Sequence, residues 1–114
     1  VTLVNVWATW CGPCLNELPE IQKVYSELKD QGIGVVGIVA DGNDAKDTAK
    51  EPIELDSLTY KIIIPDSNLE KKLISTLRGF PTSYVVDSEG KILGMKLGGM
   101  NAEGFKAFIE QYAK

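Results

Sequence analysis

The chain has 114 residues, of which 44% are hydrophobic, and its formal net charge is −4 at pH 7. This length and apolar content suffice for one core, so a single domain spanning residues 1–114 is expected. The acidic balance argues against binding to nucleic acid or to an anionic membrane surface. No apolar run in the sequence approaches the roughly 18 residues that a membrane-spanning helix needs. No signal-peptide pattern is visible and Val1 falls inside an expected strand, so we expect a processed or excised domain.

The first part of the chain predicts a strand, a helix and a second strand. Residues 1–8 are rich in β-branched and aromatic side chains, which is typical of a buried strand. From about residue 13 to residue 30, apolar side chains recur at helical spacing; Pro19 is expected to kink this helix and Gly32 to stop it. Residues 33–40 form another apolar run. The two strands should be parallel and joined by a right-handed crossover.

The middle of the chain carries weaker signals. Residues 41–60 are polar, and they predict a weak helix that Asn43 or Asp44 caps and Pro52 interrupts. Residues 61–64 then predict a short strand, and residues 69–77 a helix.

The last part predicts a β-hairpin followed by a closing helix. Two strands, at residues 82–87 and 91–97, flank a Ser-Glu-Gly turn at residues 88–90. An apolar stripe then indicates an amphipathic helix, with its members at Ala102, Phe105, Phe108, Ile109 and Tyr112. Everything in the pattern indicates one compact α/β domain.

The chain has two cysteines, Cys11 and Cys14, placed where the first strand gives way to the first helix. The first N–H groups of a helix have no intrahelical partner and carry partial positive charge, which stabilises a thiolate at Cys11. Cysteines in such motifs titrate at roughly 3.5–7.5 instead of about 8.5. Residues three apart share a helical face, so Cys14 can close a disulfide with Cys11. Pro13 lacks an N–H and suits the first helical turn.

Two other interpretations of this pair are a structural zinc site and an inert disulfide. Zinc takes four ligands, whereas the chain offers one cysteine pair and no histidine, so no metal is expected unless subunits share one. An inert disulfide more often joins distant segments, and this one would close a very small loop. A CxxC motif beside a βαβ pattern therefore favours redox chemistry, without a separate cofactor.

Two segments carry a family resemblance. The sequence NVWATWCGPC at residues 5–14, with Glu-Leu-Pro at 17–19, resembles the thioredoxin superfamily and specifically its TlpA/ResA-like thiol–disulfide oxidoreductases. The sequence RGFPT at residues 78–82 resembles the cis-proline segment of that superfamily. The resemblance covers essentially the whole chain. It implies a thioredoxin-like α/β fold with a central mixed sheet flanked by helices, and a helix–strand insertion between the second main strand and the cis-proline segment.

Individual residues acquire expected roles. Cys11, at the helix tip, should attack a substrate disulfide, and Cys14 should then resolve the mixed disulfide. The resemblance implies that Glu17 tunes cysteine acidity or accepts the Cys14 proton; the alternative is a solvated glutamate near a helix start. It also implies that Pro81 is cis beside the cysteines, although most X–Pro bonds are trans. The backbone of Phe80 would then pair with a bound substrate chain.

One residue departs from the superfamily pattern. Thioredoxins proper place a buried aspartate where Asn5 stands, and an amide cannot accept a proton, so Glu17 or water would take that task. Asn5 could also be a hydrogen-bonded buried amide and nothing more. Around Cys11 we expect a flat, partly apolar rim suited to docking of extended protein segments, made of Trp10, Gly12, Pro13, Phe80, Gly98 and Gly99.

The expected activity is that of a protein-disulfide reductase. Its substrates would be disulfide-containing proteins, an upstream thiol donor would re-reduce it, and it would act as a monomer. The Gly–Pro dipeptide resembles that of reducing thioredoxins, whose potentials lie near −270 mV. The alternatives are an oxidase or isomerase, an electron-donating domain for a fused partner, and a non-catalytic binding module. Direct peroxidase activity is not expected, because Ala8 stands where a peroxidase would carry threonine.

Location follows from the resemblance alone. TlpA/ResA-like proteins imply a bacterial, extracytoplasmic protein, either periplasmic or tethered to a membrane outside the cytoplasm. A cytoplasmic location is the alternative.

Overall fold

The computed structural model describes residues 1–41, 50, 53, 57–77 and 79–113. Its strands form one mixed sheet in the order β3-β2-β1-β4-β5. Neighbours β1 and β2 are parallel, as are β2 and β3, whereas β4 runs antiparallel to both β1 and β5. The strands are β1 (Thr2–Trp7), β2 (Gly34–Val39), β3 (Lys61–Ile63), β4 (Thr82–Val86) and β5 (Ile92–Leu97).

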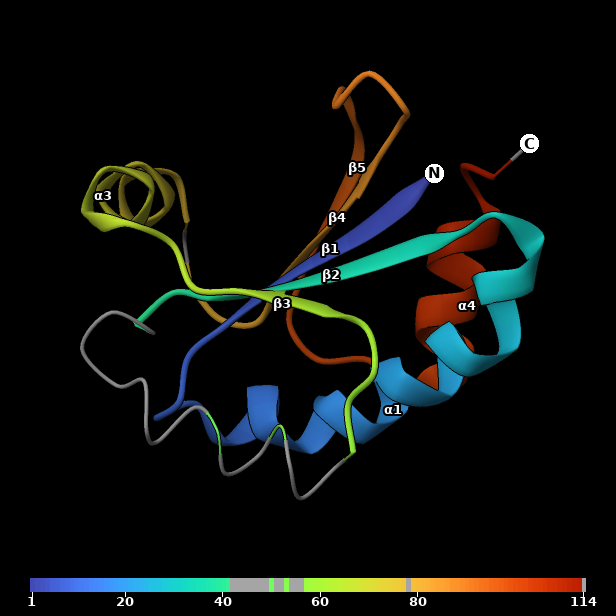
Figure 1. Ribbon diagram of the computed structural model, residues 1–114, viewed down its shortest axis with the longest axis horizontal. Helices are drawn as coiled ribbons and strands as arrows, with labels where there is room; N and C mark the ends of the chain where they lie inside the picture. The colour runs from blue at the N-terminus through green and yellow to red at the C-terminus, as the bar shows by residue number, and fades with distance from the viewer. Residues whose placement is uncertain (42–49, 51–52, 54–56, 78, 114) are drawn as a thin grey trace.

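The helices lie on both faces of this sheet. Figure 1 shows α1 (Gly12–Leu28) and α4 (Ala102–Glu110) together on one side and α3 (Ser67–Thr76) on the other. The predicted fold class, a mixed sheet flanked by helices, is confirmed. No helix in the described ranges is long and apolar enough to cross a membrane.

The predicted first helix is confirmed, with small changes at its ends. Helix α1 begins at Gly12, contains Pro19 without ending there, and runs to Leu28. A 3₁₀ turn, η1 (Lys29–Gln31), follows and ends at Gly32, whose φ of 79° is the left-handed conformation that favours glycine.

Two other helix boundaries differ from the expectation. Helix α3 begins at Ser67, before the expected residue 69, because the Asp66 carboxylate caps it by accepting the Leu69 N–H at 2.8 Å. Helix α4 ends at Glu110, so Tyr112 lies beyond it instead of in its last turn. The Tyr112 ring packs edge-on against Phe108, with 5.8 Å between centroids. The predicted capping residues Asn43 and Asp44, and the predicted break at Pro52, lie outside the described residues.

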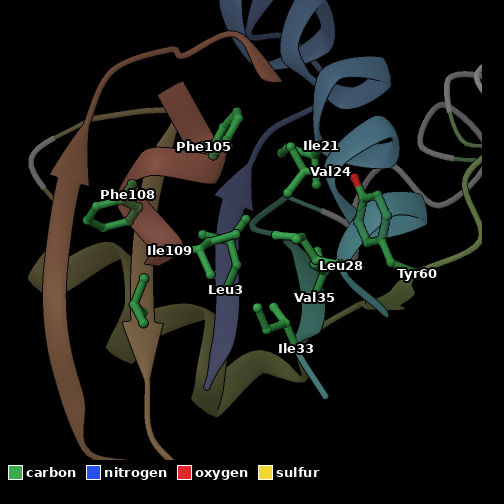
Figure 2. Packing of buried hydrophobic residues seen from close by; sticks show 11 residues of the cluster. Leu3, Ile21, Val24, Leu28, Ile33, Val35, Tyr60, Phe105, Phe108 and Ile109 are labelled. Carbon is green, nitrogen blue, oxygen red and sulfur yellow. The ribbon is translucent and has the colours of Figure 1, made fainter. Parts of the chain in front are cut away.

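Most of the core lies between the sheet and the α1–α4 pair (Figure 2). Strand side chains from this face meet apolar side chains of both helices, because alternate residues of a strand point to the same face. We call this group the α1–α4 cluster; it contains Leu3, Ile21, Val24, Leu28, Ile33, Val35, Tyr60, Val85, Phe105, Phe108 and Ile109.

A smaller apolar cluster occupies the other end of the same face. It lies where β1 and β2 end and α1 begins, and both cysteines are part of it. We call it the cysteine cluster; its buried members are Trp7, Ala8, Cys11, Cys14, Leu18 and Val39. Trp7 is fully buried.

Candidate active site

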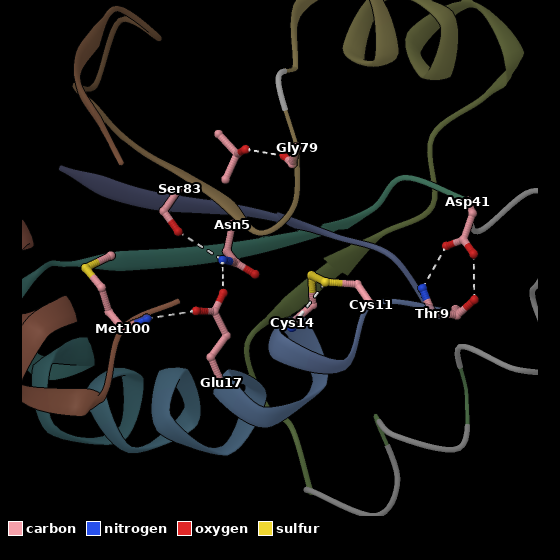
Figure 3. Close-up of a disulfide and its surroundings, with 10 residues drawn as sticks. Asn5, Thr9, Cys11, Cys14, Glu17, Asp41, Gly79, Ser83 and Met100 are labelled. Carbon is pink, nitrogen blue, oxygen red and sulfur yellow. Dashed lines mark hydrogen bonds between the residues drawn. A yellow bond between two sulfur atoms is a disulfide. The ribbon is translucent and has the colours of Figure 1, made fainter. Parts of the chain in front are cut away.

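The two cysteines form a disulfide at the N-terminus of α1, just beyond the end of β1 (Figure 3). Their Cα atoms are 5.2 Å apart. Both are buried: Cys11 exposes 5% of its surface and Cys14 none. The position is the carboxyl edge of the parallel part of the sheet, where open α/β sheets place their sites.

Cys11 is the N-cap residue of α1. Its backbone is extended, with φ −93° and ψ 104°, and its Sγ accepts the Cys14 N–H at 3.3 Å. The first turn of the helix carries no acidic side chain, so nothing in it offsets the partial positive charge of the helix start. In the reduced protein this arrangement favours a thiolate on Cys11.

Glu17 is buried, with 3% of its surface exposed. Its Oε1 accepts a hydrogen bond from Asn5 Nδ2 at 2.8 Å, and its Oε2 accepts one from the Met100 backbone N–H at 3.2 Å. Burial raises the pKa of the Glu17 carboxyl to about 7, although both hydrogen bonds act in the opposite direction. The alternative of a solvated glutamate is therefore wrong.

Asn5 lies on β1, directly opposite Ser83 on β4. Its Nδ2 donates to Glu17 Oε1 and, at 3.0 Å, to Ser83 Oγ. Its Oδ1 is buried and has no hydrogen-bond partner among the described residues. The interpretation of Asn5 as a hydrogen-bonded buried amide is confirmed for its nitrogen.

A second polar contact holds the segment just before Cys11. The Asp41 carboxylate accepts the Thr9 backbone N–H at 3.0 Å and the Thr9 hydroxyl at 2.5 Å (Figure 3). Asp41 follows the end of β2, and Thr9 follows the end of the neighbouring β1. The carboxylate therefore ties together the two chain segments that leave the carboxyl edge of the sheet.

The Phe80–Pro81 peptide bond is cis in the structure. The Pro81 carbonyl accepts the Gly98 N–H at 2.9 Å, which links the segment before β4 to the segment after β5. Phe80 packs edge-on against Trp10, with 5.6 Å between ring centroids. It also packs, partly buried, against the cysteine cluster.

The expected rim is partly brought together. Trp10 is 70% exposed, and Gly12 and Pro13 are also exposed at the start of α1. Gly99 lies on the Glu17 side, where a Cβ would stand 3.5 Å from Glu17 Oε2. A shallow hollow there is lined by Pro13, Asn16, Glu17, Glu20, Gly99, Met100 and Asn101.

Several of these contacts were missed from the sequence. Ser83 and the Met100 N–H complete the surroundings of Asn5 and Glu17, and no local pattern indicates either contact. Asp41 did have a usable signal, because it is a polar residue directly after a parallel strand, where such side chains gather at one edge. Within the described ranges no group of three or more His, Cys, Asp and Glu side chains could hold a metal.

Comparison with known proteins gives a consistent result. The Redoxin family matches residues 1–110. The thiol-disulfide oxidoreductase ResA of Halalkalibacterium halodurans is 30% identical over 107 residues, which are 94% of this chain and 59% of that protein. Sporulation thiol-disulfide oxidoreductase A of Bacillus subtilis is 28% identical over 111 residues, 96% of this chain and 67% of that protein.

Solved structures show the same similarity. A thiol:disulfide interchange protein of the thioredoxin family from Chlorobium tepidum superposes with a TM-score of 0.84 at 25% identity, over 99% of this chain and 79% of that one. StoA from Bacillus subtilis superposes with a TM-score of 0.78 at 28% identity, over 94% and 80%. The predicted TlpA/ResA-like resemblance is confirmed, while the chain spans 59% of the ResA relative's length.

Proposed function

The chain belongs to the Redoxin family, and from this premise we propose that it is a thiol–disulfide oxidoreductase that acts as a protein-disulfide reductase. The observation that carries the proposal is the disulfide itself: Cys11 caps α1 and Cys14 lies one turn inside it. We further propose that residues 1–114 form one domain and that Cys11, Cys14 and Glu17 are its catalytic residues.

The reaction is thiol–disulfide exchange. In the reduced protein, the Cys11 thiolate attacks one sulfur of a partner's disulfide and releases the other sulfur as a thiolate. Cys14 then gives up its proton and attacks Cys11 Sγ, which breaks the mixed disulfide and forms the Cys11–Cys14 bond. The partner gains two electrons, and a thiol donor later returns them to this protein. The geometry supports Cys11 as the attacking sulfur, because it stands at the helix tip and accepts the Cys14 N–H.

Glu17 supports the resolving step in this proposal. Its carboxyl has a pKa of about 7 because burial disfavours its charge, so it can take up or release a proton near neutral pH. Its hydrogen bonds in the structure go to Asn5 and Met100 and not to the cysteines. We therefore assign it to proton uptake through a small rearrangement or through water in the adjoining hollow.

The docking surface of the proposal is the rim around the disulfide. Trp10 and Phe80 supply an aromatic wall, and Gly12, Pro13, Gly98 and Gly99 supply backbone with little side-chain bulk. The buried Pro81 lies behind this surface, and we propose that it also takes part in substrate binding. Such a surface suits an extended, partly apolar protein segment that carries the substrate disulfide. The proposed partners are disulfide-containing proteins and an upstream thiol donor, and the proposed state is monomeric. By analogy with ResA-like relatives, the proposed location is extracytoplasmic.

The test is a pair of single-cysteine variants mixed with a disulfide-containing protein. Cys14→Ser should accumulate a mixed disulfide through Cys11, because nothing resolves it, and should lose multiple-turnover reduction. Cys11→Ser, the matched control, should form little adduct because Cys14 is buried. Mass spectrometry after acid quench identifies the adduct. Normal turnover by Cys14→Ser would contradict the proposal.

The direction of electron flow has its own measurement, the reduction potential of the Cys11–Cys14 pair in dithiothreitol or glutathione buffers. A value near −250 mV or below lies in the range of thioredoxin and supports a reductase. A value near −150 mV or above lies toward DsbA and would replace the reductase by an oxidase or isomerase that uses the same residues.

A further inference from the structure

One polar atom of the Asn5 side chain has no hydrogen-bond partner among the described residues. The side chain is fully buried, and both hydrogens of its Nδ2 are used, one on Glu17 and one on Ser83. The ionised Glu17 carboxylate can only accept hydrogen bonds, so in that state the amide turns its nitrogen toward Glu17 and its oxygen away. That oxygen, Oδ1, has no partner among the described residues.

Figure 3 shows where this oxygen points. From Asn5 the nitrogen faces Ser83 and Glu17, and the oxygen points away from them, toward the side of the amide on which the disulfide is drawn. Buried acceptors without a partner are rare in folded proteins and each needs an explanation. A partner that exists in only one redox state would provide it.

Cys14 is such a partner. Its sulfur lies among apolar side chains of the cysteine cluster, which disfavour a buried charge. As part of the disulfide, this sulfur has no hydrogen to donate. Reduction by a dithiol breaks the Sγ–Sγ bond and leaves a thiolate on Cys11 and a thiol on Cys14. The dithiol gives up two electrons and becomes a disulfide; one of its protons goes to Cys14 and the other to water.

We propose that in the reduced protein Asn5 Oδ1 accepts a hydrogen bond from the Cys14 thiol. Asn5 is then a positioning residue: it holds Cys14 protonated while Cys11 keeps the thiolate. Glu17 and Ser83 fix the orientation of the amide, so the buried polar side chains and the cysteine pair form one connected unit. The inference rests on the proposed function. It assigns a role to Asn5, the residue at the position where thioredoxins proper carry an aspartate.

The S–H stretching band in the infrared tests this directly, because hydrogen bonding lowers the frequency of that band. The protein is reduced with dithiothreitol, and the excess reductant is removed without oxygen. The band lost in Cys14→Ala belongs to Cys14. We expect this band to shift to higher frequency in Asn5→Leu, which keeps a similar volume without the oxygen. Thr82→Ala, the matched control, removes a buried hydroxyl of the same strand that donates to the Gly79 carbonyl and not to Asn5, and should leave the band in place.

An unshifted Cys14 band in Asn5→Leu would overturn the proposal, since the thiol would then donate to a backbone carbonyl or to water. Should Asn5→Leu fail to fold, the test uses the NMR signals of the Asn5 side-chain amide in proteins that keep Asn5. Relative to the oxidised parent protein, these signals should shift in the reduced parent protein and should not shift in reduced Cys14→Ala. Equal movement in both would also overturn it. Neither readout requires a protein substrate, so failure of the proposed reductase activity would show separately in the mixed-disulfide experiment.

Discussion

The α1–α4 cluster and the cysteine cluster share one strand and one helix, yet they differ in polarity. On the inward face of β1, Leu3 belongs to the first cluster, Trp7 to the second, and Asn5 lies between them. Along α1, Glu17 takes the corresponding place between the cysteines and Ile21. The α1–α4 cluster contains almost only aliphatic and aromatic side chains, whereas the cysteine cluster borders a buried amide and carboxyl. One end of this face is therefore packed with apolar side chains, whereas the other end also holds polar groups, and burial raises the pKa of one of them, Glu17.

Among changes that should affect one cluster and not the other, Phe105→Ala is expected to have the largest effect on stability. Phe105 is fully buried in the α1–α4 cluster, and truncating a buried phenylalanine costs about 3–5 kcal/mol of unfolding free energy. Denaturant unfolding measures this loss. Under conditions where the variant stays folded, the reduction potential should equal that of the parent. A shift in potential would show that the two clusters are not independent.

The next effect is the pH dependence of stability set by Glu17. Its pKa rises from 4.5 to about 7 on folding, so between these values the folded protein binds a proton that the unfolded chain releases. Stability should therefore fall as pH rises through this range, by up to about 3 kcal/mol, and this group adds no further change above it. Unfolding curves at several pH values measure the slope.

Glu17→Gln should make the free energy of unfolding less dependent on pH in this range. Glu20→Gln, on the same helix but with 30% of its side chain exposed beside Lys23, is the matched control and should leave the slope in place. If both variants behave alike, the slope comes from another group. In the reduced Glu17→Gln protein, unchanged cysteine pKa values together with unchanged reduction rates would refute the catalytic assignment of Glu17.

The smallest effect concerns Asp41. Removing its carboxylate in Asp41→Ala abolishes both hydrogen bonds to Thr9 and should cost about 1–2 kcal/mol. Hydrogen exchange should show lost protection of the Thr9 N–H, while amides of the α1–α4 cluster keep theirs. Asp30→Ala, an exposed position after α1, is the control and should change little. Unchanged Thr9 protection in Asp41→Ala would mean that this contact does not hold the segment before Cys11.

Local patterns predicted the elements that frame the site. Periodicity at residues 13–30 indicated α1, and the turn at residues 88–90 indicated the β4–β5 hairpin. The position of Cys11 at a helix start was also predictable, because strand and helix periods meet there. Helix ends were less accurate, as at Asp66, since a single capping side chain decides them.

The contacts that surround Glu17 could not be predicted in the same way. Asn5 lies 12 residues from Glu17 and 78 from Ser83, and Met100 lies 83 residues from Glu17. Only the strand order and the packing of α1 on the sheet bring these groups together. Glutamate is a usual surface residue, so burial of Glu17 follows from tertiary structure and not from its local sequence.

The two tryptophans of the sequence stand in opposite environments near the disulfide. Trp7 is fully buried and Trp10 is 70% exposed. Disulfides quench indole emission at short range, so reduction should brighten the intrinsic fluorescence of the protein. A soluble quencher should reach only Trp10, and a docked protein segment should shield it. The fluorescence of Trp7 therefore reports on the packing of the interior, and the fluorescence of Trp10 reports on whether a protein segment is bound at the surface.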